Sequence, residues 1–167
     1  MSSLTLPDLI LLIHHSSNWD DFVDAVYKSF VQDFIESRPI YNGNKLGLKK
    51  YPLIEGKAAT FWHMTTSGKV PELQRNLDES RCERIKWPKP IIENSSNVNN
   101  VKMWENQRNT KKGIQYRICL CFGDWEYLVV LNKRKNYILP WTAYPIVYKH
   151  DKKKLQKEYS NFMKFNP

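Results

Sequence analysis

One stretch decides the fold: residues 101–144, which read VKMWENQRNTKKGIQYRICLCFGDWEYLVVLNKRKNYILPWTAY. It contains four runs with the composition of β-strands, separated by short turns that carry glycine, asparagine, aspartate and lysine. The runs cover residues 101–108, 114–122, 127–133 and 137–144. Connections this short join antiparallel neighbours, so the pattern predicts a four-stranded antiparallel meander.

The last run continues into Pro145 and ends with the pentapeptide WTAYP, residues 141–145. Side chains alternate along a strand, so Thr142 and Tyr144 are expected on one face and Trp141 and Ala143 on the other. Prolines bracket the pentapeptide, which predicts an edge strand or a bulge. A hydroxyl and a phenol two residues apart on a sheet surface could hold a phosphate group and orient a base.

Helical patterns flank the sheet. Residues 19–37 carry apolar side chains at i, i+3, i+4 and i+7 and predict a long amphipathic helix, preceded by a short one over residues 7–15. Residues 80–87 predict a short helix that Pro88 and Pro90 stop. Residues 152–165 predict a basic closing helix.

The segment between these helices looks less regular. Residues 41–55 are predicted to be a connecting loop, residues 58–65 a strand, and the residues up to Asp78 a polar stretch. The expected class is therefore α+β, with N-terminal helices, a four-stranded antiparallel meander and a basic C-terminal helix. We expect a helical segment over residues 1–40 and an α+β unit over residues 41–167, together forming one compact unit.

Charge is distributed unevenly along the 167 residues. Lys and Arg number 26 against 17 acidic residues, which gives a net charge of +9. Residues 1–100 hold 12 basic and 12 acidic side chains, so residues 101–167 carry the whole excess. A chain whose excess positive charge lies in one half is suited to bind a polyanion. We interpret this polyanion as RNA.

Three cysteines, an odd number without a CxxC pair, indicate free buried thiols in a reducing compartment. The apolar run of residues 9–13 is too short to span a bilayer, and no targeting segment is recognisable. We therefore expect a cytoplasmic protein that needs no membrane. No cluster of carboxylates, histidines or cysteines has metal-ligand spacing, so neither a metal nor another cofactor is expected.

RNA cleavage without a metal requires a group that removes the 2′-OH proton, a group that protonates the leaving 5′-oxygen, and cations at the phosphate. Histidine suits proton transfer near neutral pH, and His63 is the best candidate because it precedes a polar run. It could equally be a histidine at the edge of the core, bonded to a backbone carbonyl. Arg84 is the candidate for phosphate binding, although Arg81, Arg84 and Lys86 could also simply face solvent on a short helix.

Basic side chains elsewhere could guide an RNA backbone toward the site. Each of them alone would be an ordinary solvated side chain. The residues for which we predict RNA contact are Lys86, Lys112, Arg117, Arg134 and Lys153.

The stretch from Arg81 to Ile146 resembles the phage-associated branch of the Barnase–EndoU–colicin–RelE-like nucleases. The resemblance follows an arginine-containing helix with Trp87 and PIIEN (residues 90–94), YLVVL (residues 127–131) and WTAYP. It implies metal-independent RNA cleavage and use as a toxin. The family's site residues would correspond to His63, Arg84, Thr142 and Tyr144. A second histidine often found in such proteins has no counterpart, so Tyr144 or Lys86 would replace it.

The resulting hypothesis is an endoribonuclease toxin that acts on RNA, such as tRNA or mRNA, and is held in check by a cognate antitoxin or immunity protein. Two alternatives remain open. A non-catalytic RNA- or DNA-binding module needs the basic half but not His63. An adaptor or antitoxin-like protein would instead dock on an acidic partner and leave RNA unprotected.

Overall fold

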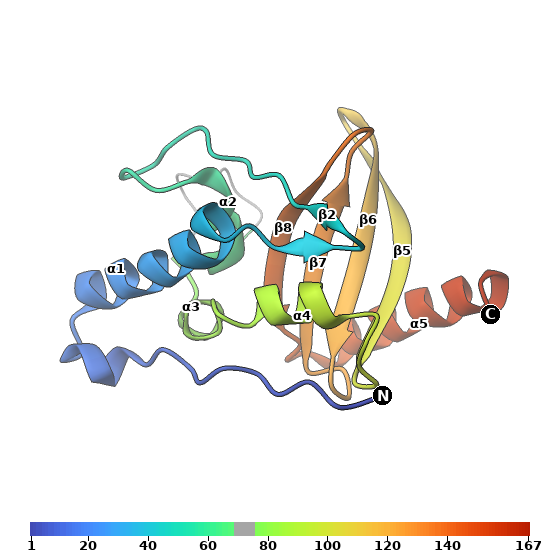
Figure 1. Ribbon diagram of the computed structural model, residues 1–167, viewed down its shortest axis with the longest axis horizontal. Coiled ribbons are helices and arrows are strands. Elements are labelled where there is room, and N and C mark those ends of the chain that lie inside the picture. The colour runs from blue at the N-terminus through green and yellow to red at the C-terminus, as the bar shows by residue number, and fades with distance from the viewer. Residues whose placement is uncertain (69–75) are drawn as a thin grey trace.

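A four-stranded antiparallel sheet forms the centre of the computed structural model, which describes residues 1–68 and 76–167 (Figure 1). Its strands follow the chain in the order β5-β6-β7-β8. Their bounds are Val101–Thr110, Gly113–Phe122, Tyr127–Lys133 and Ile138–Pro145. The predicted meander is confirmed, and each predicted strand end lies within two residues of the observed one.

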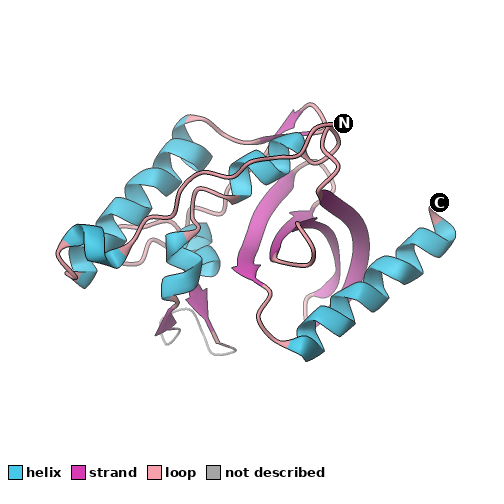
Figure 2. Ribbon diagram, turned by 90° about the horizontal axis from the view of Figure 1, so that it is seen from below, coloured by secondary structure: helices cyan, strands magenta, loops and turns pink. Residues whose placement is uncertain are grey.

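The two faces of the sheet are covered by different helices (Figure 2). Ile118, Leu120, Val129 and Leu131 pack against the N-terminal helices on one face, which we call the helical face. Cys119, Cys121, Leu128 and Val130 pack with Leu155 of helix α5 (Lys149–Phe165) on the other, which we call the α5 face. The side chains of β6 therefore alternate between the two faces, and the predicted closing helix is confirmed.

The helical layer contains the predicted long helix. Helix α1 (Trp19–Phe30) continues into a π-helical stretch, η2 (Val31–Glu36), and Asn18 caps α1 by accepting the backbone N–H of Asp21 at 3.1 Å. Its apolar stripe is buried in the core against α2 and the sheet. The other helices are η1 (Leu12–His15), α2 (Ala59–Thr65), α3 (Glu79–Glu83) and α4 (Pro88–Asn94).

Helix α2 corrects the prediction of a strand over residues 58–65. Six of its seven residues are buried, and only His63 is partly exposed. A helix that is buried on nearly every side has no polar face, so its sequence lacks the 3.6-residue period and reads as a buried strand.

The prolines at residues 88 and 90 correct a second prediction, because they begin α4 instead of ending the preceding helix. Proline is well tolerated in the first helical turn, where its missing N–H would have had no partner within the helix. The short helix expected over residues 80–87 is α3, which ends at Glu83 and continues as turns.

Further differences concern short elements. Of the short helix expected over residues 7–15, only the 3₁₀ turn η1 forms. The expected loop over residues 41–55 contains a hairpin of β1 (Ile40–Tyr41) and β2 (Asn44–Lys45). Its turn is Asn42-Gly43, with φ values of 48° and 80°, and Asn-Gly is a strong hairpin signal. A second pair is β3 (Thr66–Ser67) with β4 (Asn76–Leu77). Residues 69–75 of the polar stretch lie outside the described residues.

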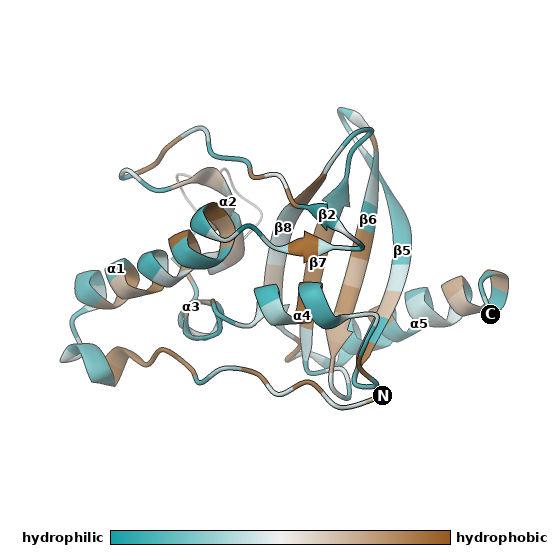
Figure 3. Ribbon diagram, viewed as in Figure 1, coloured by the Kyte–Doolittle hydropathy of each residue, from teal (hydrophilic) through white to brown (hydrophobic). Residues whose placement is uncertain are grey.

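Hydrophobic residues concentrate where β6 and β7 meet the helical layer, whereas the β5–β6 tip and much of α5 are hydrophilic (Figure 3). The N-terminal segment of the chain runs along the base of the helical layer. Ser2 forms an isolated β-bridge with Val98, and the backbone of Leu4 exchanges two hydrogen bonds with the Asn100 side chain. Among the described residues, no helix is both long and apolar enough to cross a bilayer.

Candidate active site at the edge of the sheet

Strand β8 forms one edge of the sheet, and its pentapeptide WTAYP contains a bulge. Val130 pairs with Thr142, whereas the next residue of β7, Leu131, pairs with Pro140. Trp141 is therefore an extra residue, as the flanking prolines predicted. The bulge also moves Trp141: it packs with Tyr144 on the α5 side, whereas we expected it on the face of Ala143, which lies in the helical-face core.

Helices α2 and α3 lie against this edge and bring their polar groups to it. The Thr142 hydroxyl donates a hydrogen bond to the backbone carbonyl of His63 at 3.2 Å. The imidazole of His63 stacks on the indole of Trp141, with 5.0 Å between ring centroids and 22° between ring planes. Three of the four predicted catalytic residues, His63, Thr142 and Tyr144, thus lie in one cluster on β8 and α2.

The guanidinium that joins this cluster belongs to Arg81 of α3. Its Nη1 lies 3.4 Å from Thr142 Oγ1 and 2.9 Å from the carbonyl oxygen of Thr66, and its guanidinium carbon lies 5.0 Å from the centre of the Tyr144 ring. Asp78 pairs with it at 3.7 Å. Arg81 is thereby held over the two hydroxyl-bearing side chains of β8.

Arg84, the predicted phosphate ligand, has other partners. Its guanidinium donates to the carbonyl of Ser80 at 2.9 Å, pairs with Glu83 at 3.3 Å and covers the Trp87 ring at 5.2 Å. The sequence could not separate Arg81 from Arg84, because they lie three residues apart at the end of a very short helix.

Burial sets the electrostatics of the cluster. It lowers the pKa of Arg81 and raises the pKa of Tyr144, while the nearby Arg81 charge opposes the shift of Tyr144. Tyr144 therefore stays a neutral phenol at neutral pH and can donate a hydrogen bond. His63 is half-buried, and its Nε2 atom is shielded from solvent.

A second group of polar side chains lies on the α5 face, and Arg117 is the one of them that we predicted as a site residue from the sequence. Asn106, Arg117 and Asn132 are cross-strand neighbours on β5, β6 and β7. Glu158 of α5 accepts a hydrogen bond from Asn106 Nδ2 at 2.9 Å and pairs with Arg108 at 3.3 Å. Polar residues at inward positions of strands were the available signal, and Asn132 is one, directly after the apolar run of β7.

The other predicted RNA-binding residues do not form one continuous surface. Lys112 and Arg134 are exposed in the turns after β5 and β7, which lie at the same end of the sheet in an antiparallel meander. Lys153 is exposed near the start of α5, which follows β8 at the opposite end. Lys86 lies elsewhere again, on the helical layer.

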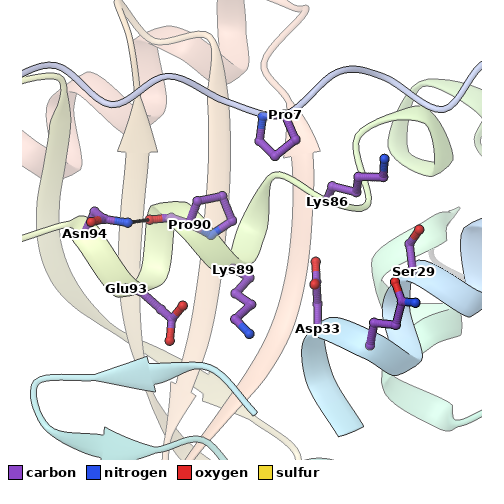
Figure 4. Close-up of a pocket in the computed structure, with 9 residues that line it drawn as sticks. Pro7, Ser29, Asp33, Lys86, Lys89, Pro90, Glu93 and Asn94 are labelled. Carbon is purple, nitrogen blue, oxygen red and sulfur yellow. Dashed lines mark hydrogen bonds between the residues drawn. The ribbon is translucent and has the colours of Figure 1, made fainter. Parts of the chain in front are cut away.

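Lys86 lines a pocket of about 320 Å³ between η2 and α4 (Figure 4). Asp33, Lys89 and Glu93 also line it, and Lys89 donates to the carbonyl of Ser37 at 2.7 Å. Burial raises the pKa of Asp33, and Lys89 and Lys86 oppose that shift. His63, Arg81, Thr142 and Tyr144 do not line this pocket, and Tyr144 is the expected replacement for a second histidine that lies in the β8 cluster.

The predicted thiols are free and buried, as the sequence indicated: Cys82, Cys119 and Cys121. Within residues 1–68 and 76–167, no group of three or more histidine, cysteine or acidic side chains could hold a metal ion.

Comparisons of the chain with protein families, curated proteins and solved structures find no match. The function must therefore be argued from the geometry of the site.

Proposed function

We propose that the protein is a metal-independent endoribonuclease that binds the scissile phosphodiester at the edge of β8. The observation that carries the proposal is the cluster of an imidazole, a guanidinium, a hydroxyl and a phenol from His63, Arg81, Thr142 and Tyr144. The resemblance noted above supports the same chemistry. So does the concentration of the entire +9 charge in residues 101–167.

In the proposed reaction the ribose 2′-oxygen forms a bond to phosphorus, and the bond from phosphorus to the 5′-oxygen breaks. The 2′-OH proton passes to a base, and the 5′-oxygen receives a proton from an acid. His63 takes one of these roles, and the neutral phenol of Tyr144 is suited to the other. Arg81 donates hydrogen bonds to the non-bridging oxygens as negative charge increases there. Thr142 accepts a hydrogen bond from Arg81 and donates one to the His63 backbone carbonyl, so it positions both residues at the phosphate.

Growth inhibition through RNA cleavage, with a cognate antitoxin or immunity protein as partner, is the biological role that the resemblance suggests. A cell that makes such an enzyme needs an inhibitor, because cleavage of tRNA or mRNA stops translation. Expression of the wild type and of His63→Ala under a tight promoter tests this role. Growth arrest by the wild type alone supports it, and equal growth of both strains contradicts it.

The activity itself is tested by incubating purified protein with total RNA in EDTA. We expect His63→Ala to abolish cleavage and Arg81→Lys to lower its rate by about 10²-fold, because a lysine cannot reproduce the bidentate contact. Arg84→Lys is the matched control and should leave the rate unchanged. Intact RNA with the wild type, or cleavage that persists in His63→Ala, contradicts the proposal.

A non-catalytic RNA-binding module is the second candidate, and the shielded Nε2 atom of His63 favours it. If the protein is such a module, both the wild type and His63→Ala bind RNA, and neither produces cleavage products. The same incubation, followed by a gel-shift measurement, therefore separates the two functions.

A further inference from the structure

The α5 face of the sheet carries a polar row that the proposed reaction does not use. Asn106, Arg117 and Asn132 lie side by side on β5, β6 and β7, because Asn106 pairs with Arg117 and Arg117 pairs with Asn132. Strand alternation directs all three toward α5, since Val130 and Cys119, two residues away, pack with Leu155 of that helix. Figure 2 shows α5 running along this face.

Each member of the row has a buried polar atom without a hydrogen bond to any described residue. These atoms are Asn106 Oδ1, Arg117 Nε and both amide atoms of Asn132. Asn132 is 1% exposed, so solvent does not reach its amide freely. Buried polar groups without a partner are rare in folded proteins and weaken them, and three in adjacent positions call for a specific explanation.

An acidic side chain of α5 already occupies one end of the row. The Glu158 carboxylate accepts hydrogen bonds from Asn106 Nδ2 at 2.9 Å and Trp104 Nε1 at 3.3 Å, and its other oxygen pairs with Arg108 at 3.3 Å. Two N–H donors and a guanidinium around one carboxylate form a receptor for an oxyanion.

Charge at this receptor is not balanced by Glu158 alone. Arg108 and Arg117 both face it, and burial, together with the charge of Arg108, lowers the pKa of Arg117. One carboxylate faces two guanidinium groups. Arg117 Nη2 donates a hydrogen bond to Gln115 Oε1 of the same strand at 3.1 Å, while Arg117 Nε has no acceptor among the described residues.

We propose that the row formed by Asn106, Arg117 and Asn132, together with the neighbouring Arg108, is a phosphate-binding site in which the Glu158 carboxylate occupies part of the space of the anion. The Arg117 and Asn132 N–H groups donate to phosphate oxygens, and displacement of Glu158 frees Asn106 and Arg108 to do the same. The site goes beyond the proposed function, because binding a phosphate group requires no cleavage. The group could come from inorganic phosphate or from a nucleic-acid backbone.

Calorimetric titration of the His63→Ala protein tests the site without any cleavage, so its result is independent of the nuclease proposal. One titration uses inorganic phosphate and a second uses a six-nucleotide RNA without terminal phosphates. Binding of phosphate alone identifies the free ion as ligand, and binding of the RNA in competition with phosphate identifies the backbone. Absence of saturable binding in both titrations overturns the proposal.

Three variants locate the binding. Arg117→Gln and Asn132→Leu should each weaken binding about tenfold, and Glu158→Gln should strengthen it several-fold because the competing charge is lost. Lys28→Gln, at an exposed position of α1, is the control for the loss of one positive charge and should leave the affinity for inorganic phosphate unchanged. Unchanged affinity in both Arg117→Gln and Asn132→Leu contradicts the proposal.

Stability provides a readout that a purely structural role of Asn132 would not give. If the amide serves a ligand, Asn132→Leu removes an unpartnered buried group and should raise the Tm of the ligand-free protein by about 2–4 °C. If the amide supports the fold, the same variant lowers the Tm. A lower Tm together with unchanged phosphate affinity therefore overturns the proposal.

Discussion

At the residue scale, the hydroxyl of Tyr144 is separable from its ring. The guanidinium carbon of Arg81 lies 5.0 Å from the centre of the Tyr144 ring. The phenolic oxygen, in contrast, makes no hydrogen bond to another described residue, so its removal breaks no structural hydrogen bond there. Tyr144→Phe should therefore change the free energy of unfolding by less than about 0.5 kcal/mol. We expect it to slow RNA cleavage by about 10²-fold, because an acid or a donor to the phosphate is removed. Denaturant unfolding and single-turnover cleavage measure the two effects. A fully active Tyr144→Phe protein would assign the proton to another group.

The three cysteines allow a second test at this scale. Burial raises the pKa of the Cys82, Cys119 and Cys121 thiols to about 12. The thiolate is the reactive form, so at pH 8 the folded protein should react with iodoacetamide far more slowly than a free cysteine. In denaturant all three should react at the ordinary rate, because an unfolded thiol has a pKa near 8.5. Mass spectrometry counts the modified sites, and rapid labelling of one cysteine in the folded state would show that its helix or strand opens.

At the scale of elements, Leu155 is the residue that fixes α5 to the sheet. It is 5% exposed and packs with Trp104, Trp125 and Val130. Leu155→Ala should cost about 2–5 kcal/mol of unfolding free energy and loosen α5. The exposed neighbour Lys153→Ala should change stability by less than about 0.5 kcal/mol. Denaturant midpoints test the energies, and hydrogen exchange confined to α5 tests the local effect. Equal exchange rates in both variants would mean that other contacts hold the helix.

Elements also differ in how well the sequence predicts them. The strands of the meander alternate cleanly between two covered faces and are divided by turn residues, so both their number and their facing were predictable. Helix α2 was not, because burial on nearly all sides removes the polar face by which a helix is recognised. The bulge at Trp141 was foreseeable from its prolines, but its effect on facing was not, since a bulge shifts the alternation by one residue.

For the molecule as a whole, the sequence predicted the residue types of the candidate site better than their positions. His63, Thr142 and Tyr144 meet as expected, yet the neighbouring guanidinium is that of Arg81. The polar row forms because β5, β6 and β7 pair with one another. Its end residues, Asn106 and Asn132, lie 26 residues apart in the sequence. Contacts between strands are fixed by register, and a single residue gives no local sign of its cross-strand neighbour.

The distribution of charge over the molecule leads to the last prediction, which concerns salt. Lys112 and Arg134 are exposed in turns at the same end of the sheet, so both can contact one RNA backbone. Each phosphate contact that is lost lowers the slope of log K against log salt by about 0.7 for single-stranded RNA. The double variant Lys112→Ala/Arg134→Ala, in the His63→Ala background that leaves RNA intact, should therefore reduce the slope by about 1.4.

The matched control removes the same net charge from the electrically neutral half of the chain, through Lys28→Ala/Lys50→Ala, two exposed lysines of the helical layer and its following loop. Its slope should equal that of the parent, because only contacts that release counterions from the RNA affect the slope. Fluorescence anisotropy between 50 and 200 mM salt, roughly the range over which such contacts are measurable, gives both slopes. Equal reductions in the two variants would show that RNA responds to net charge alone, and the turn end of the sheet would then not be its binding surface.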